Sequence, residues 1–125
     1  MAAKSANKPK ILLIDDETAI LHALGLFLEL EGYVVEGLTK FDKYISRLNQ
    51  TNIPDLVILD ILLNGEDGVE IAKKLKSNSK TKNIPIVMIS ALPDGEKQSK
   101  EAGVDAFLAK PFDVKDLNKI LKKYL

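Results

Sequence analysis

Charged and hydroxyl side chains stand at the ends of several apolar runs in this sequence. Asp15 and Asp16 follow "ILLI", Asp60 ends "LVILD", Ser90 ends "IPIVMIS" and Lys110 ends "GVDAFLAK". Two carboxylates about 4 Å apart repel by roughly 4 kcal/mol at an effective dielectric near 20, so three gathered together need a proton or a cation. Mg²⁺ fits oxygen ligands of this kind, because it accepts few protein ligands and commonly bridges to phosphate. The residue types therefore indicate a place where Mg²⁺ and a phosphoryl group meet.

Each of these side chains also has a simple structural explanation when it is taken alone. Asp16 and Ser90 could cap the helices that follow them, and Asp60 could start a turn. Lys110 precedes Pro111 and could be a solvated lysine before a turn. The combination favours a functional site, because chance placement of all these types at the ends of separate runs is improbable.

The elements that must position these residues alternate along the chain. Runs rich in Val, Ile and Leu predict five strands, at residues 11–15, 33–38, 56–60, 84–90 and 103–110. Apolar residues at three- and four-residue spacing predict helices between them, near residues 20–27, 41–48, 71–75 and 114–124, with a weaker helix at 94–102. Alternating strands and helices predict a parallel sheet covered on both faces. Ligands of such sheets bind beyond the carboxyl ends of the strands, where the polar residues stand.

Composition limits the function classes. The 125 residues suit one domain, and 18 basic side chains balance 18 acidic ones, so charge favours neither nucleic acid nor an anionic membrane as a partner. The chain contains no cysteine, which excludes thiolate catalysis and cysteine-bound zinc. The first nine residues lack the apolar stretch of a signal peptide, and no later run is long enough to insert in a membrane. We therefore expect a cytoplasmic protein.

Four segments carry a resemblance to a known family. They are "ILLIDDE" (11–17), "DLVILDILLNGEDG" (55–68), "IPIVMISA" (84–91) and "GVDAFLAKPF" (103–112). In this order and at this spacing they resemble the receiver domain of two-component response regulators, over nearly the whole chain from Lys10 to Leu125. The resemblance implies a flavodoxin-like, doubly wound α/β fold with a five-stranded parallel sheet of order 2-1-3-4-5 and five helices. We expect residues 10–125 to form this domain and residues 1–9 to form a flexible tail.

The resemblance implies a role for each matched residue. Asp60 would accept a phosphoryl group from a phosphohistidine, and Lys110 would contact the phosphoryl oxygens. Mg²⁺ would be bound by Asp16 directly and by Asp15 mostly through water, together with Asp60 and the backbone carbonyl of Leu62. The chain would then be a switch that catalyses only its own phosphorylation and dephosphorylation.

The resemblance also identifies the residues that would report phosphorylation. Ser90 would be the switch hydroxyl, and Phe107 stands where an aromatic residue of the family moves with it. The family often has Tyr at that position, and Phe107 could equally be plain core. The Lys110–Pro111 bond is similar to the cis peptide of the family.

Two surfaces are expected to bind partners. The segment "AILHALGLFLEL" (19–30) has apolar residues around most of its circumference, more than a single core-facing stripe requires. Such a helix indicates a docking surface, although a few exposed leucines on an ordinary surface are an equal explanation. The resemblance implies that the partner docked there is a sensor histidine kinase or a histidine phosphotransfer protein. A downstream protein or a second copy would bind beside the strands at 84–90 and 103–110 and the helix at 94–102. His22, the only histidine, has no expected catalytic role.

Three rival functions fit the sequence less well. An aspartate-dependent phosphohydrolase needs a second acid two residues after its nucleophile, and that position is Leu62. A flavin- or nucleotide-binding module needs a glycine-rich phosphate loop after the first strand, where this chain has "DDETA". A degenerate receiver that only binds proteins usually lacks an acid or the lysine, and both are retained. Whether the domain stands alone or belongs to a longer regulator stays open.

Overall fold

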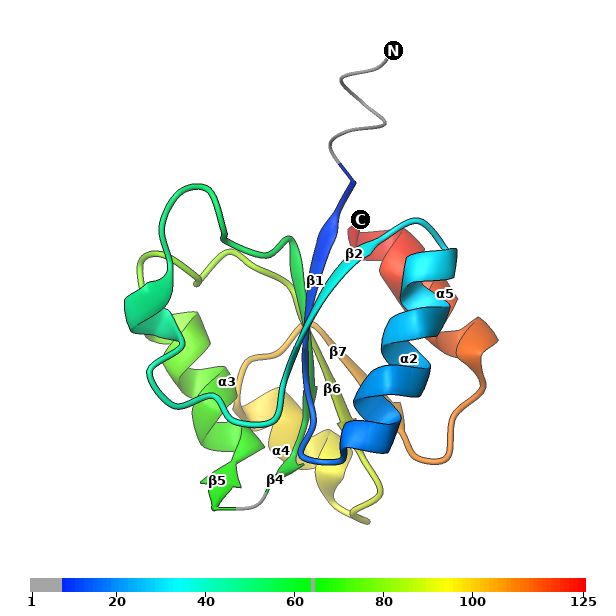
Figure 1. Ribbon diagram of the computed structural model, residues 1–125. Coiled ribbons are helices and arrows are strands. Elements are labelled where there is room, and N and C mark those ends of the chain that lie inside the picture. The colour runs from blue at the N-terminus through cyan, green and yellow to red at the C-terminus, as the bar shows by residue number, and fades with distance from the viewer. Residues whose placement is uncertain (1–7, 64) are drawn as a thin grey trace.

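Five parallel strands form one central sheet in the computed structural model, which describes residues 8–63 and 65–125 (Figure 1). The strands are β1 (Lys10–Ile14), β2 (Val34–Leu38), β3 (Leu56–Asp60), β6 (Ile86–Ser90) and β7 (Ala106–Ala109). Their spatial order is β2-β1-β3-β6-β7, and every neighbouring pair is parallel. This confirms the predicted α/β class and the order 2-1-3-4-5.

Helices cover both faces of the sheet (Figure 1). The helices α2 (Thr18–Leu30) and α5 (Val114–Tyr124) lie on one face, and α3 (Gly68–Ser77) and α4 (Gly95–Glu101) lie on the other. Leu24 and Leu28 of α2 pack with Leu117 and Leu121 of α5 in one buried cluster. The other cluster gathers Ile71, Ala72 and Leu75 of α3 against the opposite side of the strands. Central strands buried on both sides explain why their sequences are apolar throughout.

The prediction of five helices was wrong by one. Among the described residues there are four α-helices, and the segment predicted as a helix at 41–48 contains only the 3-10 turn η1 (Ile45–Arg47). The apolar spacing there reflects burial, because Phe41, Tyr44 and Leu48 all lie in the core. Lys43 has a φ of 61°, in the left-handed region that interrupts a right-handed helix.

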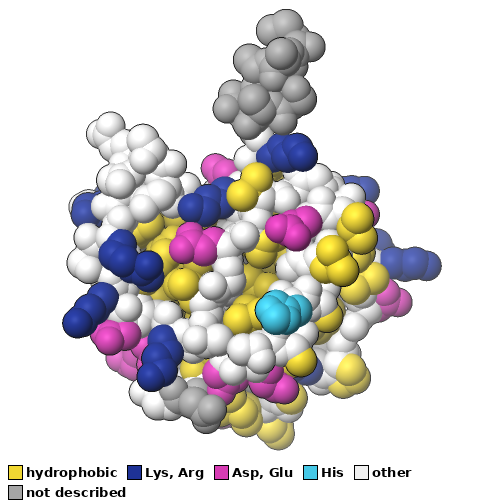
Figure 2. Space-filling view, viewed as in Figure 1, with side chains coloured by type: hydrophobic (Ala, Val, Ile, Leu, Met, Phe, Trp, Pro, Cys, Tyr) yellow, Lys and Arg dark blue, Asp and Glu magenta, His cyan; other side chains and the backbone are white. Residues whose placement is uncertain are grey.

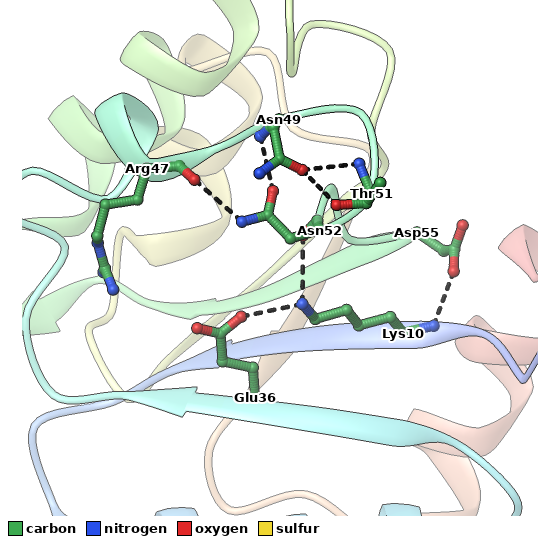
Figure 3. A network of polar contacts seen from close by, with 7 residues as sticks. All are labelled: Lys10, Glu36, Arg47, Asn49, Thr51, Asn52 and Asp55. Atoms are coloured by element: carbon green, nitrogen blue, oxygen red, sulfur yellow. Dashed lines mark hydrogen bonds and ion pairs between the residues drawn. The ribbon is translucent and has the colours of Figure 1, made fainter.

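A network of polar contacts shapes the chain after this turn (Figure 3). The Asn52 side chain donates to the Arg47 carbonyl at 3.0 Å and accepts the Asn49 N–H at 2.7 Å. Lys10 ties the segment to the sheet, since its Nζ donates to the Asn52 carbonyl at 3.2 Å and pairs with Glu36 at 3.2 Å. Asparagine side chains thus supply the hydrogen bonds that a helix would have supplied from its backbone.

A short hairpin that was not predicted follows β3. Its strands β4 (Leu62–Leu63) and β5 (Glu66–Asp67) pair antiparallel, between the strand predicted at 56–60 and the helix predicted at 71–75. The Asp67 side chain then accepts the Val69 N–H at 2.9 Å and caps the start of α3. Asn64 and residues 1–7 of the predicted tail lie outside the described residues.

No helix in the described part of the chain is long and apolar enough to cross a membrane.

Candidate functional site

The carboxyl ends of β1, β3, β6 and β7 meet at one edge of the sheet, at the bottom of Figure 1. Lys110 follows β7 and reaches across this edge, with its Nζ 2.6 Å from Oδ2 of Asp60 and 3.7 Å from Oδ2 of Asp15. Asp60 is 7% exposed and Asp15 is 4% exposed. Three residues separated by up to 95 positions therefore meet as predicted, and Figure 2 shows acidic side chains gathered at this lower rim.

The ammonium of Lys110 offsets only part of the negative charge here. Burial raises the pKa of Asp15, while the hydrogen bond from the Glu17 N–H and the charge of Lys110 oppose that shift. Burial alone would lower the pKa of Lys110, but the hydrogen bond and charge of Asp60, with the charge of Asp15, raise it. Lys110 is thus held protonated beside two carboxylates, and Asp15 resists ionisation because it is buried.

One acidic residue that the sequence reasoning did not assign joins this group. Carboxylate oxygens of Asp15, Asp16 and Glu17 lie within 4.8 Å of one another. Glu17 is exposed, and its N–H donates to Oδ1 of Asp15 at 3.0 Å. The signal was present in the run "DDE" at 15–17. Hard oxygen donors at this spacing suit Mg²⁺.

The backbone after β3 holds the Asp60 carboxylate in place. The Leu62 N–H donates to Oδ1 of Asp60 at 3.1 Å, so one oxygen faces the loop while the other faces Lys110. Gly68, the first residue of α3, lies so close that an added Cβ would be 2.3 Å from the Asp60 carbonyl oxygen and 2.6 Å from Cα of Ile61. The loop from β3 to α3 therefore requires glycine at this position, for which the sequence offered no specific signal.

Of the two predicted switch residues, Ser90 ends β6 at this edge of the sheet, and Phe107 lies two residues further inside the sheet on β7. Ser90 is 1% exposed, and its Oγ accepts the Leu92 N–H at 2.9 Å. Phe107 is paired in register with Met88 of β6 and is half-buried. The Ser90 carbonyl accepts the Lys110 N–H at 2.9 Å, so a backbone hydrogen bond joins the end of β6 to Lys110. The Lys110–Pro111 peptide bond is cis, which confirms the expectation.

Comparison with known proteins identifies the same arrangement. The family model described as "Response regulator receiver domain" matches residues 11–122. The transcriptional regulatory protein ResD of Bacillus subtilis is 33% identical over 115 residues, which cover 89% of this chain and 45% of ResD. The chain spans about half the length of the curated relatives it matches.

Solved structures agree with this family assignment. A putative response regulator from Chloroflexus aurantiacus is 31% identical, with a TM-score of 0.84 covering 94% of this chain and 98% of that one. The receiver domain of the sensor histidine kinase PA1611 from Pseudomonas aeruginosa, solved with a magnesium ion in its active-site cleft, is 23% identical. Its TM-score is 0.82, covering 94% of this chain and 97% of that one, and it supports the fold alone.

Receiver domains are signalling switches rather than conventional enzymes, and a phosphoacceptor aspartate with Mg²⁺ is typical of them. Their place in two-component systems implies a histidine kinase as partner. The matched family model, covering residues 11–122, and the fold show that this chain belongs to the response regulator receiver domain family.

Proposed function

We propose that Asp60 accepts a phosphoryl group from a phosphohistidine and that the product changes which partner this domain binds. The observation that carries the proposal is the buried Asp60 carboxylate at the end of β3, with the Lys110 ammonium 2.6 Å from one oxygen. In the transfer, a carboxylate oxygen forms a bond to phosphorus while the bond from phosphorus to the imidazole nitrogen breaks. The electron pair of the broken bond stays on the imidazole.

The residues of the site would compensate the charge of the transferred group. Lys110 places a cation beside the attacking carboxylate, and the Leu62 N–H orients the other carboxylate oxygen. Groups fixed in place before the reaction stabilise the developing charge without reorganising. The position two residues after Asp60 carries no acid, so no side chain there is suited to drive rapid turnover of a substrate.

The donor set fits Mg²⁺. Asp15 and Asp16 would hold the ion, with Asp60 and the Leu62 carbonyl as further ligands, and Glu17 stands close enough to add an oxygen or bind its water. Bound Mg²⁺ would supply positive charge to the phosphoryl oxygens and relieve repulsion among the carboxylates.

Ser90 and Phe107 would change position in response to phosphorylation of Asp60. A phosphoryl group adds about −1.5 to −2 charge at neutral pH and offers strong acceptor oxygens. The Ser90 hydroxyl would leave the Leu92 N–H to donate to one of them, with Phe107 following. The Phe107 ring carries no hydroxyl, so its response would be one of packing alone.

A histidine kinase or phosphotransfer protein would dock on α2. An apolar groove of about 230 Å³ lies between α2 and the start of α5, lined by Ile20, Ala23, Leu24, Phe27, Phe112 and Val114. Phe112 follows Lys110 by two residues, which places the groove beside the phosphoacceptor rim. Leu30 of α2 adds apolar surface that is 78% exposed, and Figure 2 shows hydrophobic side chains on the α2 side. Leu26, 59% exposed, instead lines a separate hollow between α2 and β2.

The output would pass through the opposite side of the rim, to a downstream protein or a second copy that contacts β6, α4 and β7. Residues 10–125 would be the receiver domain and residues 1–9 a tail, in the cytoplasm, without direct contact to nucleic acid. ResD, a transcriptional regulatory protein, is about twice as long as the segment it shares with this chain, so both a stand-alone switch and one part of a longer regulator are compatible with the match.

Intact mass after incubation with acetyl phosphate and Mg²⁺ tests the proposal. We expect one added phosphoryl group on the wild type, none on Asp60→Asn and none after chelation of the metal. A wild type that gains no phosphoryl group would overturn the proposal and favour a receiver fold used only for protein binding. An adduct that persists in Asp60→Asn would place the acceptor elsewhere.

A further inference from the structure

Gly95, the first residue of α4, lies in direct contact with both predicted switch residues. A Cβ added at Gly95 would be 2.9 Å from Cβ and 2.9 Å from Oγ of Ser90, and 3.2 Å from Cε1 of Phe107. Carbon atoms in ordinary contact are about 3.5–4.0 Å apart. Three elements, α4, β6 and β7, therefore meet at a position that has no room for a side chain.

Space, and not backbone conformation, is what requires glycine here. The φ of Gly95 lies outside the left-handed region, so an alanine could adopt the same backbone. Gly25, in the middle of α2, shows the contrast, because a Cβ there would meet nothing closer than Cγ1 of Val35 at 3.8 Å. Alanine at Gly25 is sterically free, while alanine at Gly95 must displace a neighbour.

One of the two Ser90 atoms that crowd position 95, the hydroxyl oxygen Oγ, is also the atom expected to move. Ser90 Oγ now lies against Gly95 and accepts the Leu92 N–H at 2.9 Å, so the hydroxyl is directed at the connection from β6 to α4. The Gly95 N–H donates to the Leu92 carbonyl at 3.1 Å, which joins the same connection to the first turn of α4. Rotation of Ser90 toward Asp60 would remove a hydrogen bond from Leu92 and a packing contact from Gly95 together.

We propose that Gly95 is a positioning residue of the switch: lacking a side chain, it lets α4 pack directly on the Ser90 hydroxyl and the Phe107 ring, so the first turn of α4 responds to where Ser90 lies. The inference rests on the proposed role of Ser90.

A side chain at Gly95 breaks this contact in the absence of any phosphoryl group. The clash with Ser90 Oγ is relieved by rotating the hydroxyl, but the clash with Ser90 Cβ requires α4 to move away from β6. In Gly95→Ala the start of α4 is therefore already displaced before phosphorylation. Phosphorylation should then displace it further by only a small amount.

Hydrogen exchange over residues 95–101, with and without beryllofluoride and Mg²⁺ as a phosphoryl analogue, tests the response. We expect the analogue to change exchange there in the wild type and in the control Gly25→Ala. In Gly95→Ala we expect exchange about tenfold faster before the analogue is added, and little further change after it. A response of Gly95→Ala equal to that of Gly25→Ala would overturn the inference.

A double-mutant cycle tests the contact without any phosphoryl group. Ser90→Gly removes both Ser90 atoms that crowd position 95, so Gly95→Ala should shift the unfolding equilibrium less in that background than in the wild type. Additive effects would overturn the inference. If Gly95→Ala alone fails to fold, recovery of folding in the double variant supports the contact, and continued failure contradicts it.

These outcomes are separate from the fate of the proposed function. A wild type that takes no phosphoryl group overturns the role of Asp60, and with it the coupling of Ser90 to α4. A wild type that is phosphorylated, with additive mutations and an unchanged response in α4, overturns the role of Gly95 alone.

Discussion

Lys110 places its ammonium beside Asp60, the proposed phosphoacceptor. Its hydrogen bond of 2.6 Å to Asp60 joins two ionised groups, which makes it stronger than a bond between neutral groups. The same ammonium lies 3.7 Å from Asp15, so its loss would leave two buried carboxylates without their cation. Under the proposed function, the charge that would bind the transferred group is therefore already in place before transfer.

Lys110→Met is expected to slow phosphoryl incorporation by about 10²–10³-fold, the effect of removing one fixed group from a site of developing charge. Methionine keeps an unbranched four-atom side chain, with sulfur in place of one methylene, and lacks the ammonium. The measurement is the initial rate of adduct formation by intact mass. The exposed Lys119→Met is the matched control, and a Lys110→Met rate within about twofold of that control would contradict the role.

Tyr44 should make the stability of the fold depend on pH in the alkaline range. It is 3% exposed, and its hydroxyl has no hydrogen-bond partner within the part of the chain that the structure describes. Burial, with a smaller contribution from the charge of Glu36, raises its pKa from 10.0 to about 12. Between those values the unfolded chain loses a proton that the folded chain keeps, so stability is complete below pH 10 and falls as the pH rises.

The free energy of unfolding of the wild type should therefore fall by about 2 kcal/mol more than that of Tyr44→Phe between pH 10 and pH 12. At pH 7 the two proteins should differ by less than about 1 kcal/mol, because the phenylalanine fills the same space and the lost hydroxyl has no partner in the described structure. Urea unfolding across this pH range is the measurement. If the free energies of unfolding of the wild type and Tyr44→Phe fall in parallel with pH, Tyr44 ionises as readily in the folded protein as in the unfolded chain.

At the level of elements, the close packing of α3 on β3 sets the position of Asp60. Gly68 begins α3, donates its N–H to the Ile61 carbonyl at 2.9 Å, and leaves no space for a Cβ beside the Asp60 carbonyl. The hairpin β4–β5 spans this short connection, and its Glu66 accepts the Phe41 N–H at 2.8 Å. The loop after the phosphoacceptor is thus bound both to a helix and to the segment that replaces the predicted helix.

Gly68→Ala is expected to destabilise the fold by about 3 kcal/mol or more and to reduce phosphoryl incorporation, because the added methyl must push α3 away from β3. Gly25→Ala, where the methyl fits, should instead be neutral or raise stability by about 0.5–1 kcal/mol. Chemical denaturation of both variants makes the comparison. Equal stability of the two alanine variants would contradict the close approach.

At the level of the whole molecule, the metal and the fold are expected to be coupled. The carboxylates of Asp15, Asp16 and Glu17 lie within 4.8 Å of one another, and this concentration of negative charge opposes folding when no cation is bound. A ligand that binds only the folded state stabilises it by mass action. The domain should therefore be least stable in the form that is free of divalent ions.

Mg²⁺ at about 100 times its Kd should raise the free energy of unfolding by about 3 kcal/mol, and a chelator should reverse the change. Asp16→Asn should lose most of this gain, while Glu101→Gln, an exposed acid on α4, should keep it. The shift in the thermal midpoint with and without Mg²⁺ is the measurement. An equal shift in Asp16→Asn and the wild type would exclude Asp16 as a ligand.

The class of fold and the residue types at the carboxyl edge of its sheet follow from the order and chemistry of the residues. A strand buried on both faces must be apolar along its length, so a charged or hydroxyl residue such as Asp60 or Ser90 marks its end. Because parallel strands end on the same side, local patterns were enough to predict that Asp15, Asp60 and Lys110 meet. These inferences needed only the chemistry and order of the residues.

How closely the elements approach one another depends on packing in three dimensions, which no local pattern predicts. Phe41, Tyr44 and Leu48 have helical spacing, but a positive φ at Lys43 and hydrogen bonds from asparagine side chains bury them without a helix. Gly68 likewise has a steric role that depends on distances between segments that are not neighbours in the chain. The requirement for glycine at position 95 has the same origin. A local sequence shows which residues favour turns or the core, but it does not show the ångström-scale gap between a helix and a strand.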